Sequence, residues 1–449
     1  MVCKTTHGLL RLLNKGGTAF PGRAALKLCP GVLEKVSRGI NIIAVTGTNG
    51  KTTACRMIEA ALARAGLPVM ANRSGANLQG GITTQFILNT DAGLHPKKCW
   101  AVIECDEAAS VRVFGQMHPR VVVVTNIFRD QLDRYGEVTH TRELIVKALR
   151  SCPDAVLCLN ADCSLTASIA GALPNRTRFF GLAEPAAAGR GDPGESDAPR
   201  CIFCGGAYAY DYRSYAHLGG FFCPKCGWSR PRADVEVTRI VEGAAESSTV
   251  LMRVDGRMHR VRIGLGAIYN VYNAAAAAAA VTAAGLDAAP ALAALSDFRR
   301  GFGRMESFPL GTHGAQMLLV KNPAALDRAL EHVLSSDGEF ALALCLNDRA
   351  ADGRDVSWIW DAGLERLASA SGLRQVFVSG DRAYDMALRL KYSGLAAERI
   401  VIQRDHGELI KMLGSCGCRV YILPTYTAML ELRSLLVRRV GGSQFWELT

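Results

Sequence analysis

The chain has 449 residues, of which 49% are hydrophobic and 21% charged, and its formal net charge is +11. This length allows two or three domains with sizeable cores, and the composition is that of an ordinary globular protein. No run of about 18 uncharged apolar residues occurs, so no membrane-spanning helix is expected. The positive charge suggests an anionic partner, such as a nucleotide, a phosphorylated substrate, nucleic acid or an acidic membrane, without choosing among them.

Residues 1–40 are expected to form a short N-terminal segment, too short for a domain. They are basic and mixed, without the apolar core of an export signal. Fifteen cysteines in a chain without such a signal favour reduced thiols and a metal site over disulfides. We therefore expect a cytoplasmic protein, whose charge would also suit a peripheral position at the inner face of the membrane.

Residues 42–53, IIAVTGTNGKTT, predict a phosphate-binding loop. A β-branched apolar run, typical of a buried parallel strand, leads into glycines and then into an alanine-rich helix, 54–65. Glycines let backbone N–H groups approach phosphate oxygens, and the helix N-terminus adds positive potential. The alternative is a tight turn with a surface lysine. The predicted ATP contacts are Gly47, Thr48, Asn49, Gly50, Lys51, Thr52 and Thr53, with Lys51 for the phosphates and the Thr52 hydroxyl for Mg²⁺.

Strand-like and helical runs then alternate up to about residue 181. We predict strands at 100–104, 121–125 and 155–160 and a helix at 137–150. This rhythm favours a parallel α/β sheet. Glu104 ends its strand, where a carboxylate beside a phosphate loop can bind Mg²⁺, with Asp106 and Glu107 as competitors. Thr125 and Asn126 are expected at the same ligand-binding edge.

Two C-x-x-C pairs follow a flexible stretch at 183–200. Cys201 and Cys204 are separated by 18 residues from Cys223 and Cys226. This is zinc-ribbon spacing, and four thiolates would close a tetrahedral shell, so we predict a structural zinc site within an insert of about 198–232. Redox-active or unligated cysteines are the alternative.

Residues 235–263 predict two or three antiparallel strands, and 269–284 predict a helix that returns to the nucleotide domain. Asn270 and Asn273 share one face of that helix. Asn270 is a candidate for reading the adenine edge, or alternatively a helix N-cap. The segment 301–306, GFGRME, resembles a hinge where Arg304 would neutralise phosphate charge.

The α/β rhythm restarts near residue 316 and predicts a second, Rossmann-like domain without a dinucleotide motif. Its predicted strands are 317–320, 341–346, 375–379, 399–403 and 419–423, with helices such as 323–335 and 426–437. Asp352 and Asp355 lie in ADGRDVSWIWD, which follows one of these strands. Acids, a glycine and tryptophans after a strand suggest a site loop, although a turn pinned by aromatic packing would give the same pattern.

Together these motifs resemble the Mur ligase family. VTGTNGKTT matches its ATP loop, and TNIFRDQLDRYG, LNADCSL, GAIYNVYN and GRME match further segments in order over about 40–310. The resemblance implies an α/β fold with a Mur ligase central ATP-binding domain at 41–308, interrupted by the Cys₄ zinc ribbon. A Rossmann-like C-terminal domain at 309–449 follows. It also implies chemistry in which ATP phosphorylates a carboxylate and an amine attacks the acyl phosphate.

Several departures from that family narrow the interpretation. No UDP-sugar-binding domain precedes the loop, and Ile145 stands where classical members have a carbamylated lysine, Lys147 being the nearest. These features, with the ribbon and DVSWIWD, resemble the MurT-type branch. That resemblance implies a heterodimer with a GatD-type glutamine amidotransferase that supplies ammonia. The ligase would then convert the D-glutamate α-carboxyl of the lipid II stem peptide to D-isoglutamine, using ATP, Mg²⁺ and structural Zn²⁺.

In this branch an aspartate of the C-terminal domain is thought to complete the partner's Cys-His pair. We assign that role to Asp355, with Asp352 as second choice. Two alternatives are a folylpolyglutamate-synthase-like ligase and a zinc-ribbon nucleic-acid-binding ATPase. The ribbon and DVSWIWD argue against the first. Basic residues scattered along the chain argue against the second, so no nucleic acid partner is expected.

Overall fold

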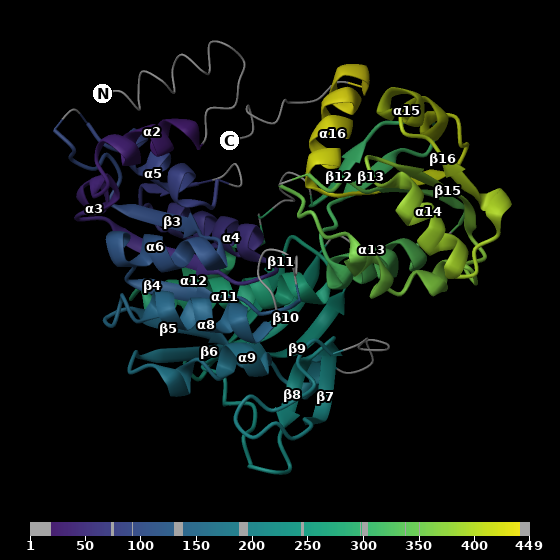
Figure 1. Cartoon of the computed structure of the whole chain (residues 1–449). Coiled ribbons are helices and arrows are strands. Elements are labelled where there is room, and N and C mark those ends of the chain that lie inside the picture. Colours follow the sequence, from purple (N-terminus) through teal and green to yellow (C-terminus); the bar gives the residue numbers. More distant parts are fainter. Residues whose placement is uncertain are drawn as a thin grey trace. The chain divides into compact units, whose positions relative to one another are not determined.

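The computed structural model describes residues 19–72, 76–91, 93–129, 138–187, 196–243, 247–296, 298, 304–336, 338–349 and 351–440 (Figure 1). The chain divides into two compact units. The first comprises Met1–Phe128 and Glu137–Arg299, and the second comprises Arg129–Gly136 and Arg300–Thr449. Among the described helices, none combines the length and the apolar character needed to cross a membrane.

The first unit is organised around a nine-stranded sheet in the order β11-β10-β9-β6-β5-β4-β1-β3-β2. Strands β1 to β6 pair in parallel, and β9 is parallel to β6. Strands β9, β10 and β11 are antiparallel, as the sequence predicted. The bounds are β1 Asn41–Thr46, β2 Val69–Ala71, β3 Trp100–Glu104, β4 Val121–Val124, β5 Val156–Asn160, β6 Thr177–Leu182, β9 Val235–Gly243, β10 Ser248–Val254 and β11 Arg257–Ile263.

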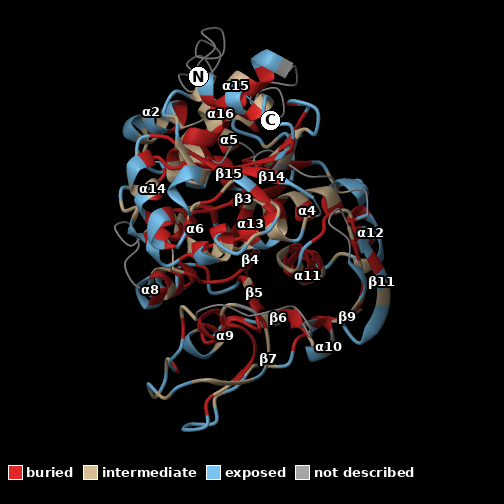
Figure 2. Cartoon of the chain, turned by 90° about the vertical axis from the view of Figure 1, so that its right-hand side faces the viewer, coloured by how far each residue is buried: buried red, intermediate tan, exposed pale blue. Residues whose placement is uncertain are grey.

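Helices cover both faces of this sheet, which is why its central strands are continuous apolar runs buried along their length. Figure 2 shows α6 and α8 on one side of the sheet and α4 and α11 on the other. The helices of the unit are α2 Phe20–Leu28, α3 Val32–Ser37, α4 Lys51–Arg64, α5 Gln79–Leu88, α6 Glu107–Met117, α8 Val138–Leu149, α9 Ser164–Ala167, η1 Ala170–Ala172, α10 Glu184–Ala187, α11 Ile268–Ala283 and α12 Ala288–Ala294. The described part of the predicted N-terminal segment forms α2 and α3, which pack against α5.

Helix α11 lies in the centre of its layer, against α4 and the sheet. Its alanines at 274–280 are all buried, and such small side chains let a helix approach neighbouring backbone closely. The polar residues at the start of α11 are thereby held beside the start of α4. The returning helix that the sequence predicted is confirmed, with the nucleotide loop as its neighbour.

The cysteine-rich insert forms a two-stranded antiparallel hairpin, β7 (Ala209–Tyr215) and β8 (Leu218–Phe222). The two C-x-x-C turns flank this hairpin. Isolated bridges join Arg200 to Ala207 and Phe222 to Ser229, so each turn closes on its own strand pair.

The second unit has a six-stranded sheet in the order β12-β13-β17-β14-β15-β16, parallel except at the β12–β13 edge. Its strands are β12 Arg304–Phe308, β13 Ala315–Leu318, β14 Phe340–Cys345, β15 Leu373–Ser379, β16 Ile400–Ile402 and β17 Arg419–Pro424. Its helices are α13 Pro323–Leu334, η2 Ser357–Trp360, η3 Leu364–Leu367, α14 Ala383–Tyr392, η4 Ala397–Arg399, α15 His406–Gly414 and α16 Tyr426–Val440. Alternate residues of β14 enter separate hydrophobic clusters, because helices cover both faces.

Half of the segment predicted as a hinge lies in a strand of the second unit. Residues 301–303 lie outside the described residues, but the rest of GRME begins β12, the edge strand of the second sheet. Glu306 accepts two hydrogen bonds from Arg433 Nε on α16, at 3.0 and 2.9 Å. Residues 304–308 are therefore part of the second unit.

Candidate functional site: an ATP loop, a metal ribbon and an aspartate loop

The turn between β1 and α4 requires glycine at two positions. Gly47 and Gly50 have φ angles of +114° and +87°, in the left-handed region. A Cβ on Gly47 would lie 2.5 Å from the Thr125 hydroxyl oxygen, and one on Gly50 would lie 2.2 Å from Asn273 Oδ1. The loop therefore passes in close contact with the end of β4 and the start of α11.

Asn126 holds this loop in place by its side chain and its backbone. Its Oδ1 accepts from the Asn49 N–H at 2.9 Å, and its Nδ2 donates to the Asn49 carbonyl at 3.0 Å. The Thr48 N–H donates to the Asn126 carbonyl at 2.9 Å. The sequence placed Asn126 at the ligand edge, and the structure shows that its side chain and its backbone hold the loop.

The first turn of α4 can receive an anion. The N–H groups of Lys51, Thr52 and Thr53 have no acceptor within the helix, by the geometry of an α-helix. Among the described residues, no side chain caps this helix start. The N–H groups and the positive end of the helix together form a phosphate cradle.

Lys51 is buried, with 7% of its surface exposed, and its ammonium points back over the loop. It donates to the Gly47 carbonyl at 2.5 Å and to Glu107 Oε1 at 2.9 Å. Burial lowers the pKa of Lys51, but the nearby carboxylates of Glu107, Glu104 and Asp106 raise it by more. Lys51 is therefore charged, and it is paired with Glu107.

The acids Glu104, Asp106 and Glu107, at the end of β3 and directly after it, make different contacts. Asp106 caps α6 by accepting from the N–H groups of Ala108 and Ala109, both at 3.1 Å. Glu107 pairs with Lys51. Glu104 is buried, and its Oε1 accepts from Asn77 Nδ2 at 3.3 Å. Of the predicted competitors, Glu104 is the one whose carboxylate is not used for a cap or a lysine pair.

The donor chemistry here fits Mg²⁺. The Thr52 hydroxyl and the Glu104 carboxylate are hard oxygen ligands, which this ion prefers, and Mg²⁺ commonly binds through one or two such groups plus substrate phosphates. Asn72 fixes the backbone of Glu104 from both sides: its Oδ1 accepts from the Glu104 N–H at 2.9 Å, and its Nδ2 donates to the Glu104 carbonyl at 2.8 Å.

The asparagines of α11 lie beside the loop, as the sequence suggested. Ala267, not Asn270, is the N-cap residue of α11, so the capping alternative does not apply. Asn270 Nδ2 instead donates to the Gly266 carbonyl at 2.6 Å. Asn273, which we did not select as a site residue, is the one that contacts Gly50, and its three-residue spacing from Asn270 was the available signal. The backbone of Arg304 begins β12, and its side chain lies outside the described residues.

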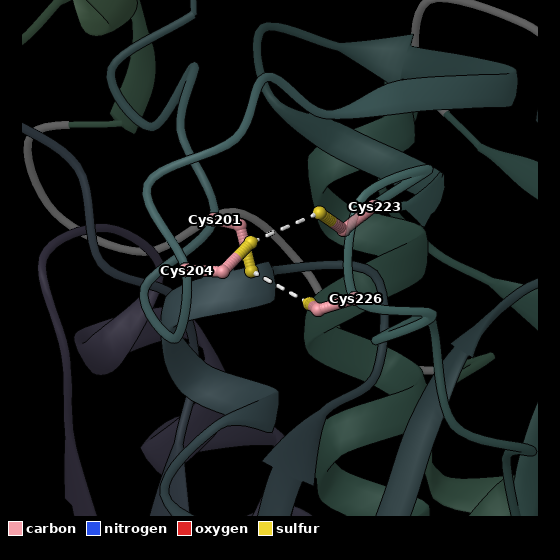
Figure 3. Close-up of side chains that lie close together, drawn as sticks. All are labelled: Cys201, Cys204, Cys223 and Cys226. Carbon is pink, nitrogen blue, oxygen red and sulfur yellow. Dashed lines mark hydrogen bonds between the residues drawn. The ribbon is translucent and has the colours of Figure 1, made fainter.

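Four cysteine thiols converge in the ribbon (Figure 3). The Sγ atoms of Cys201, Cys204, Cys223 and Cys226 all lie within 4.8 Å of one another. Cys201 and Cys226 are 3.6 Å apart, and Cys204 and Cys223 are 3.5 Å apart. Tetrahedral zinc with Zn–S bonds of about 2.3 Å requires sulfur separations of about 3.8 Å, so this cluster fits a closed four-sulfur site.

A backbone hydrogen bond closes each C-x-x-C turn, and the pKa of the Cys201 thiol is lowered. The Gly205 N–H donates to the Cys201 carbonyl at 2.8 Å, and the Gly227 N–H donates to the Cys223 carbonyl at 2.9 Å. Burial raises the pKa of Cys201, but N–H groups of Phe203 and Cys204 lower it by more, to about 7. A thiol that ionises near neutrality is a ready metal ligand.

The two candidate aspartates of the second unit have different environments. Asp352 is buried, and it accepts hydrogen bonds from both the N–H and the hydroxyl of Thr427. Asp355 is half-buried, and its Oδ1 accepts from the Ser357 N–H at 2.8 Å. Trp358 and Ile359 anchor the segment in the core. Asp352 therefore ties its loop to the start of α16, while Asp355 lies on a fixed segment with more access to solvent.

Two family models match the chain. The Mur ligase middle domain matches residues 45–196, and the MurT ligase C-terminal domain matches residues 319–429. A relative from Streptococcus pneumoniae, strain R6, named lipid II isoglutaminyl synthase (glutamine-hydrolyzing) subunit MurT, is 35% identical over 437 residues. That match covers 97% of this chain and 96% of the relative. A MurT subunit from Staphylococcus aureus, strain N315, is 32% identical, with 99% and 98% covered.

Solved structures of low identity share the fold. A pseudomurein peptide ligase type C from Methanothermus fervidus has a TM-score of 0.68 at 20% identity, covering 89% of this chain and 79% of the ligase. MurF from Acinetobacter baumannii has a TM-score of 0.67 at 19% identity, covering 91% and 79%. A folylpolyglutamate synthase from Mycobacterium tuberculosis has 0.64 at 13% identity, covering 95% and 99%. These likenesses confirm the predicted fold class.

Proposed function

Since the chain belongs to the Mur ligase family, and within it to the MurT subunits of lipid II isoglutaminyl synthase, we propose how its residues carry out the amidation. The enzyme is an ATP-dependent carbon–nitrogen ligase of peptidoglycan synthesis, and it converts the D-glutamate α-carboxyl of the lipid II stem peptide to D-isoglutamine. The observation that carries the residue assignments is the uncapped start of α4, together with the buried carboxylate of Glu104, which is near enough to raise the pKa of Lys51.

In this proposal the loop residues 47–53 bind the phosphates of ATP, with Asn270 and Arg304 as further nucleotide contacts. Lys51 leaves Glu107 and neutralises charge on the transferred phosphoryl group, which is how such a lysine lowers the barrier. Thr52 and Glu104 hold Mg²⁺, which supplies Lewis-acid stabilisation to the phosphates when bound. Zinc in the Cys₄ ribbon is structural, since four sulfurs leave no open position for a substrate.

The reaction balances without any further co-reactant. The substrate carboxylate attacks the γ-phosphorus of ATP, ADP leaves, and an acyl phosphate forms. Ammonia then attacks the acyl carbon, phosphate leaves, and the ammonia nitrogen loses a proton to give the amide. Ammonia needs no binding pocket of amino-acid size. The second unit therefore does not have to bind an amino acid, and it can serve another purpose.

We assign that purpose to the supply of ammonia by a GatD-type glutamine amidotransferase that forms a heterodimer with this chain. Asp355 completes the partner's Cys-His pair by accepting a hydrogen bond from the histidine. An aspartate in this role fixes the tautomer and stabilises the imidazolium. The second oxygen of Asp355 has no donor among the described residues, whereas Asp352 is saturated by Thr427. This contrast favours Asp355.

An exposed apolar stripe lies next to the Asp355 segment and fits the same partner. Tyr384, Leu388 and Tyr392 recur every four residues along α14 and are 64%, 49% and 72% exposed. Trp360, which is 48% exposed, packs edge-on against Tyr392 with ring centroids 5.7 Å apart. Aromatic residues of this kind dominate protein interfaces. Arg389 donates to the carbonyl groups of Ile359 and Ala362, and so fixes the stripe to the Asp355 segment.

The substrate is held at a membrane, and we place the enzyme at the cytoplasmic face. Its net charge of +11 supports attraction to anionic lipid. Salt-sensitive binding to anionic vesicles is the expected measurement, and salt-independent binding, or none, would contradict this placement.

The experiment that tests the proposal separates the two nitrogen sources. Asp355→Asn should lower glutamine-dependent amidation of lipid II at least about 100-fold, because the histidine loses its orienting acid. Amidation driven by ammonium chloride should persist, and nucleotide binding should also be unchanged. Asp352→Asn is the matched control, and it should lower stability more than it lowers glutamine use. Full glutamine-dependent activity in Asp355→Asn would remove the assignment.

A further inference from the structure

Asp162 is a buried carboxylate that the proposed reaction does not use. It follows β5 in the LNADC segment, and its exposed fraction is 0%. It accepts hydrogen bonds from Arg230 Nε at 2.7 Å, from the Tyr272 hydroxyl at 2.6 Å and from the Leu182 N–H at 2.9 Å. Burying a carboxylate costs several kcal/mol unless it is paired, so these three donors have to remain in position.

Two of its contacts come from the metal ribbon. Arg230 follows the second C-x-x-C turn by four residues, and its backbone N–H donates to the Phe221 carbonyl on β8 at 2.9 Å. The Gly219 N–H, also on β8, donates to the Asp162 carbonyl at 3.0 Å. A Cβ on Gly181 would lie 2.3 Å from Asp162 Oδ1, which shows how closely this carboxylate meets β6. The orientation of Arg230 therefore depends on the ribbon's strand pairing.

The contact between Asp162 and Tyr272 leads to the nucleotide loop. Tyr272 lies in α11 with 3% of its surface exposed, and its hydroxyl contacts Asp162 and also Ser214 Oγ of β7 at 2.7 Å. The next residue is Asn273, whose Oδ1 lies so close to Gly50 that a Cβ there would be 2.2 Å away. Gly50 is the N-cap of α4, directly before Lys51.

We infer that the metal-bound ribbon positions the ATP loop, through a chain of contacts in which Arg230 and Ser214 fix Asp162 and Tyr272, and Tyr272 fixes Asn273 against Gly50. The ribbon thus fixes the position of α11, an arrangement we call the clamp, and it affects nucleotide affinity without contacting the nucleotide. Tyr272 and Asp162 are positioning residues: they do not touch the nucleotide, and they act by holding Asn273. This inference rests on the proposed nucleotide site and on the fit of a metal to the four thiols.

The test measures the dissociation constant of a fluorescent ATP analogue for the full chain with its partner. Tyr272→Phe removes the hydroxyl that links the ribbon to α11, and we expect affinity to fall about tenfold, the effect of roughly one hydrogen bond. At saturating ATP the turnover number should change less than about threefold, because the loss affects ground-state and transition-state binding alike. Tyr210→Phe is the matched control. Its hydroxyl donates to the His217 carbonyl at 3.4 Å, so it breaks a contact inside the β7–β8 hairpin and leaves the contacts of Asp162 and Tyr272 in place.

Zinc removal is the second part of the test. It is measured by nucleotide affinity and not by turnover. Chelation should weaken binding by the native protein by a similar factor, but should weaken binding by Tyr272→Phe little further, because both changes break one chain of contacts. Losses that simply add, or equal losses in Tyr210→Phe and Tyr272→Phe, would overturn the inference.

If the metal-free protein unfolds, as judged by circular dichroism, Ser214→Ala in the metal-bound protein decides instead. This milder change removes the ribbon's partner of the Tyr272 hydroxyl and should weaken nucleotide binding roughly two- to fivefold. Unchanged affinity in both Ser214→Ala and Tyr272→Phe would reject the clamp. Failure of the native protein to bind nucleotide at all would instead reject the proposed ATP site, so the two failures are distinguishable.

Discussion

The Lys51 ammonium lies 2.9 Å from the carboxylate of Glu107, and both side chains are buried. Lys51 sits in the first turn of α4, where the phosphates of ATP are proposed to bind, so Glu107 and the nucleotide compete for one cation. The pair keeps the buried charge of Lys51 compensated, which is the condition under which such a lysine can stay ionised.

Replacing this acid tests the competition. In Glu107→Gln the buried ammonium loses its counter-charge, and the free energy of unfolding without nucleotide should fall by about 3 kcal/mol. Saturating ATP should restore most of that loss, because phosphate replaces the carboxylate. Urea unfolding with and without ATP measures both values. Glu34→Gln, an exposed acid of α3, is the control, and an equal loss with and without ATP would contradict the exchange.

The exposed stripe on α14 predicts where the partner binds. Leu388→Asp or Tyr392→Asp should lower affinity for the amidotransferase subunit at least about tenfold, because a charge would be buried in an aromatic contact. Isothermal titration between the separate subunits is the measurement. Nucleotide binding should not change. Met258→Asp, an exposed apolar residue of β11, is the control, and undisturbed affinity in both α14 variants would place the interface elsewhere.

The ribbon predicts a bound metal. Elemental analysis of the purified native chain should find about one zinc per molecule. Cys223→Ser, which changes a buried ligand, should lose the metal and lower the melting temperature. Cys99→Ser, at an exposed cysteine outside the cluster, should do neither. A full complement of zinc in Cys223→Ser would show that the metal is held by other groups.

Buried thiols predict a loss of stability in alkali. Burial raises the pKa of Cys158 to about 12, with the same direction and value for Cys345. In the unfolded chain such thiols ionise near pH 8.5, so above that pH the unfolded state binds fewer protons than the folded state. The free energy of unfolding should therefore be unaffected by these groups below about pH 8. Between about pH 9 and 12 it should fall by about 1.4 kcal/mol per pH unit for each thiol.

Urea midpoints at several pH values between 7.5 and 10.5 measure this slope. Cys158→Ala should reduce this slope by the contribution of one thiol, about 1.4 kcal/mol per pH unit. Cys99→Ala should leave the slope unchanged, because that thiol is exposed in both the folded and the unfolded state. Equal slopes in the native protein and Cys158→Ala would mean that the buried thiol does not govern the alkaline limit.

Sequence periodicity located most of the elements. Strand β3 occupies the predicted 100–104, and β14, β15 and β17 lie within one or two residues of their predicted bounds. Such strands are readable because they are buried on both faces, so every position must be apolar, while the glycines and helix signals around them are local. The loop at 47–53 and the C-x-x-C pairs were equally readable, since their chemistry depends on neighbours in sequence.

The sequence by itself therefore determined the fold class, and it predicted the phosphate-binding loop and the four cysteines whose thiols the structure brings together. Only the tertiary structure decided which contacts each polar side chain makes, and therefore which role it has. Asp106 caps a helix, Glu107 holds Lys51, and Glu104 stays available, although the three lie within four positions of one another. Likewise Asp352 is used by Thr427, and Asp162 joins the ribbon to α11 across segments far apart in the chain. A carboxylate's role is set by its donors, and those donors come from distant segments whose approach no local pattern encodes.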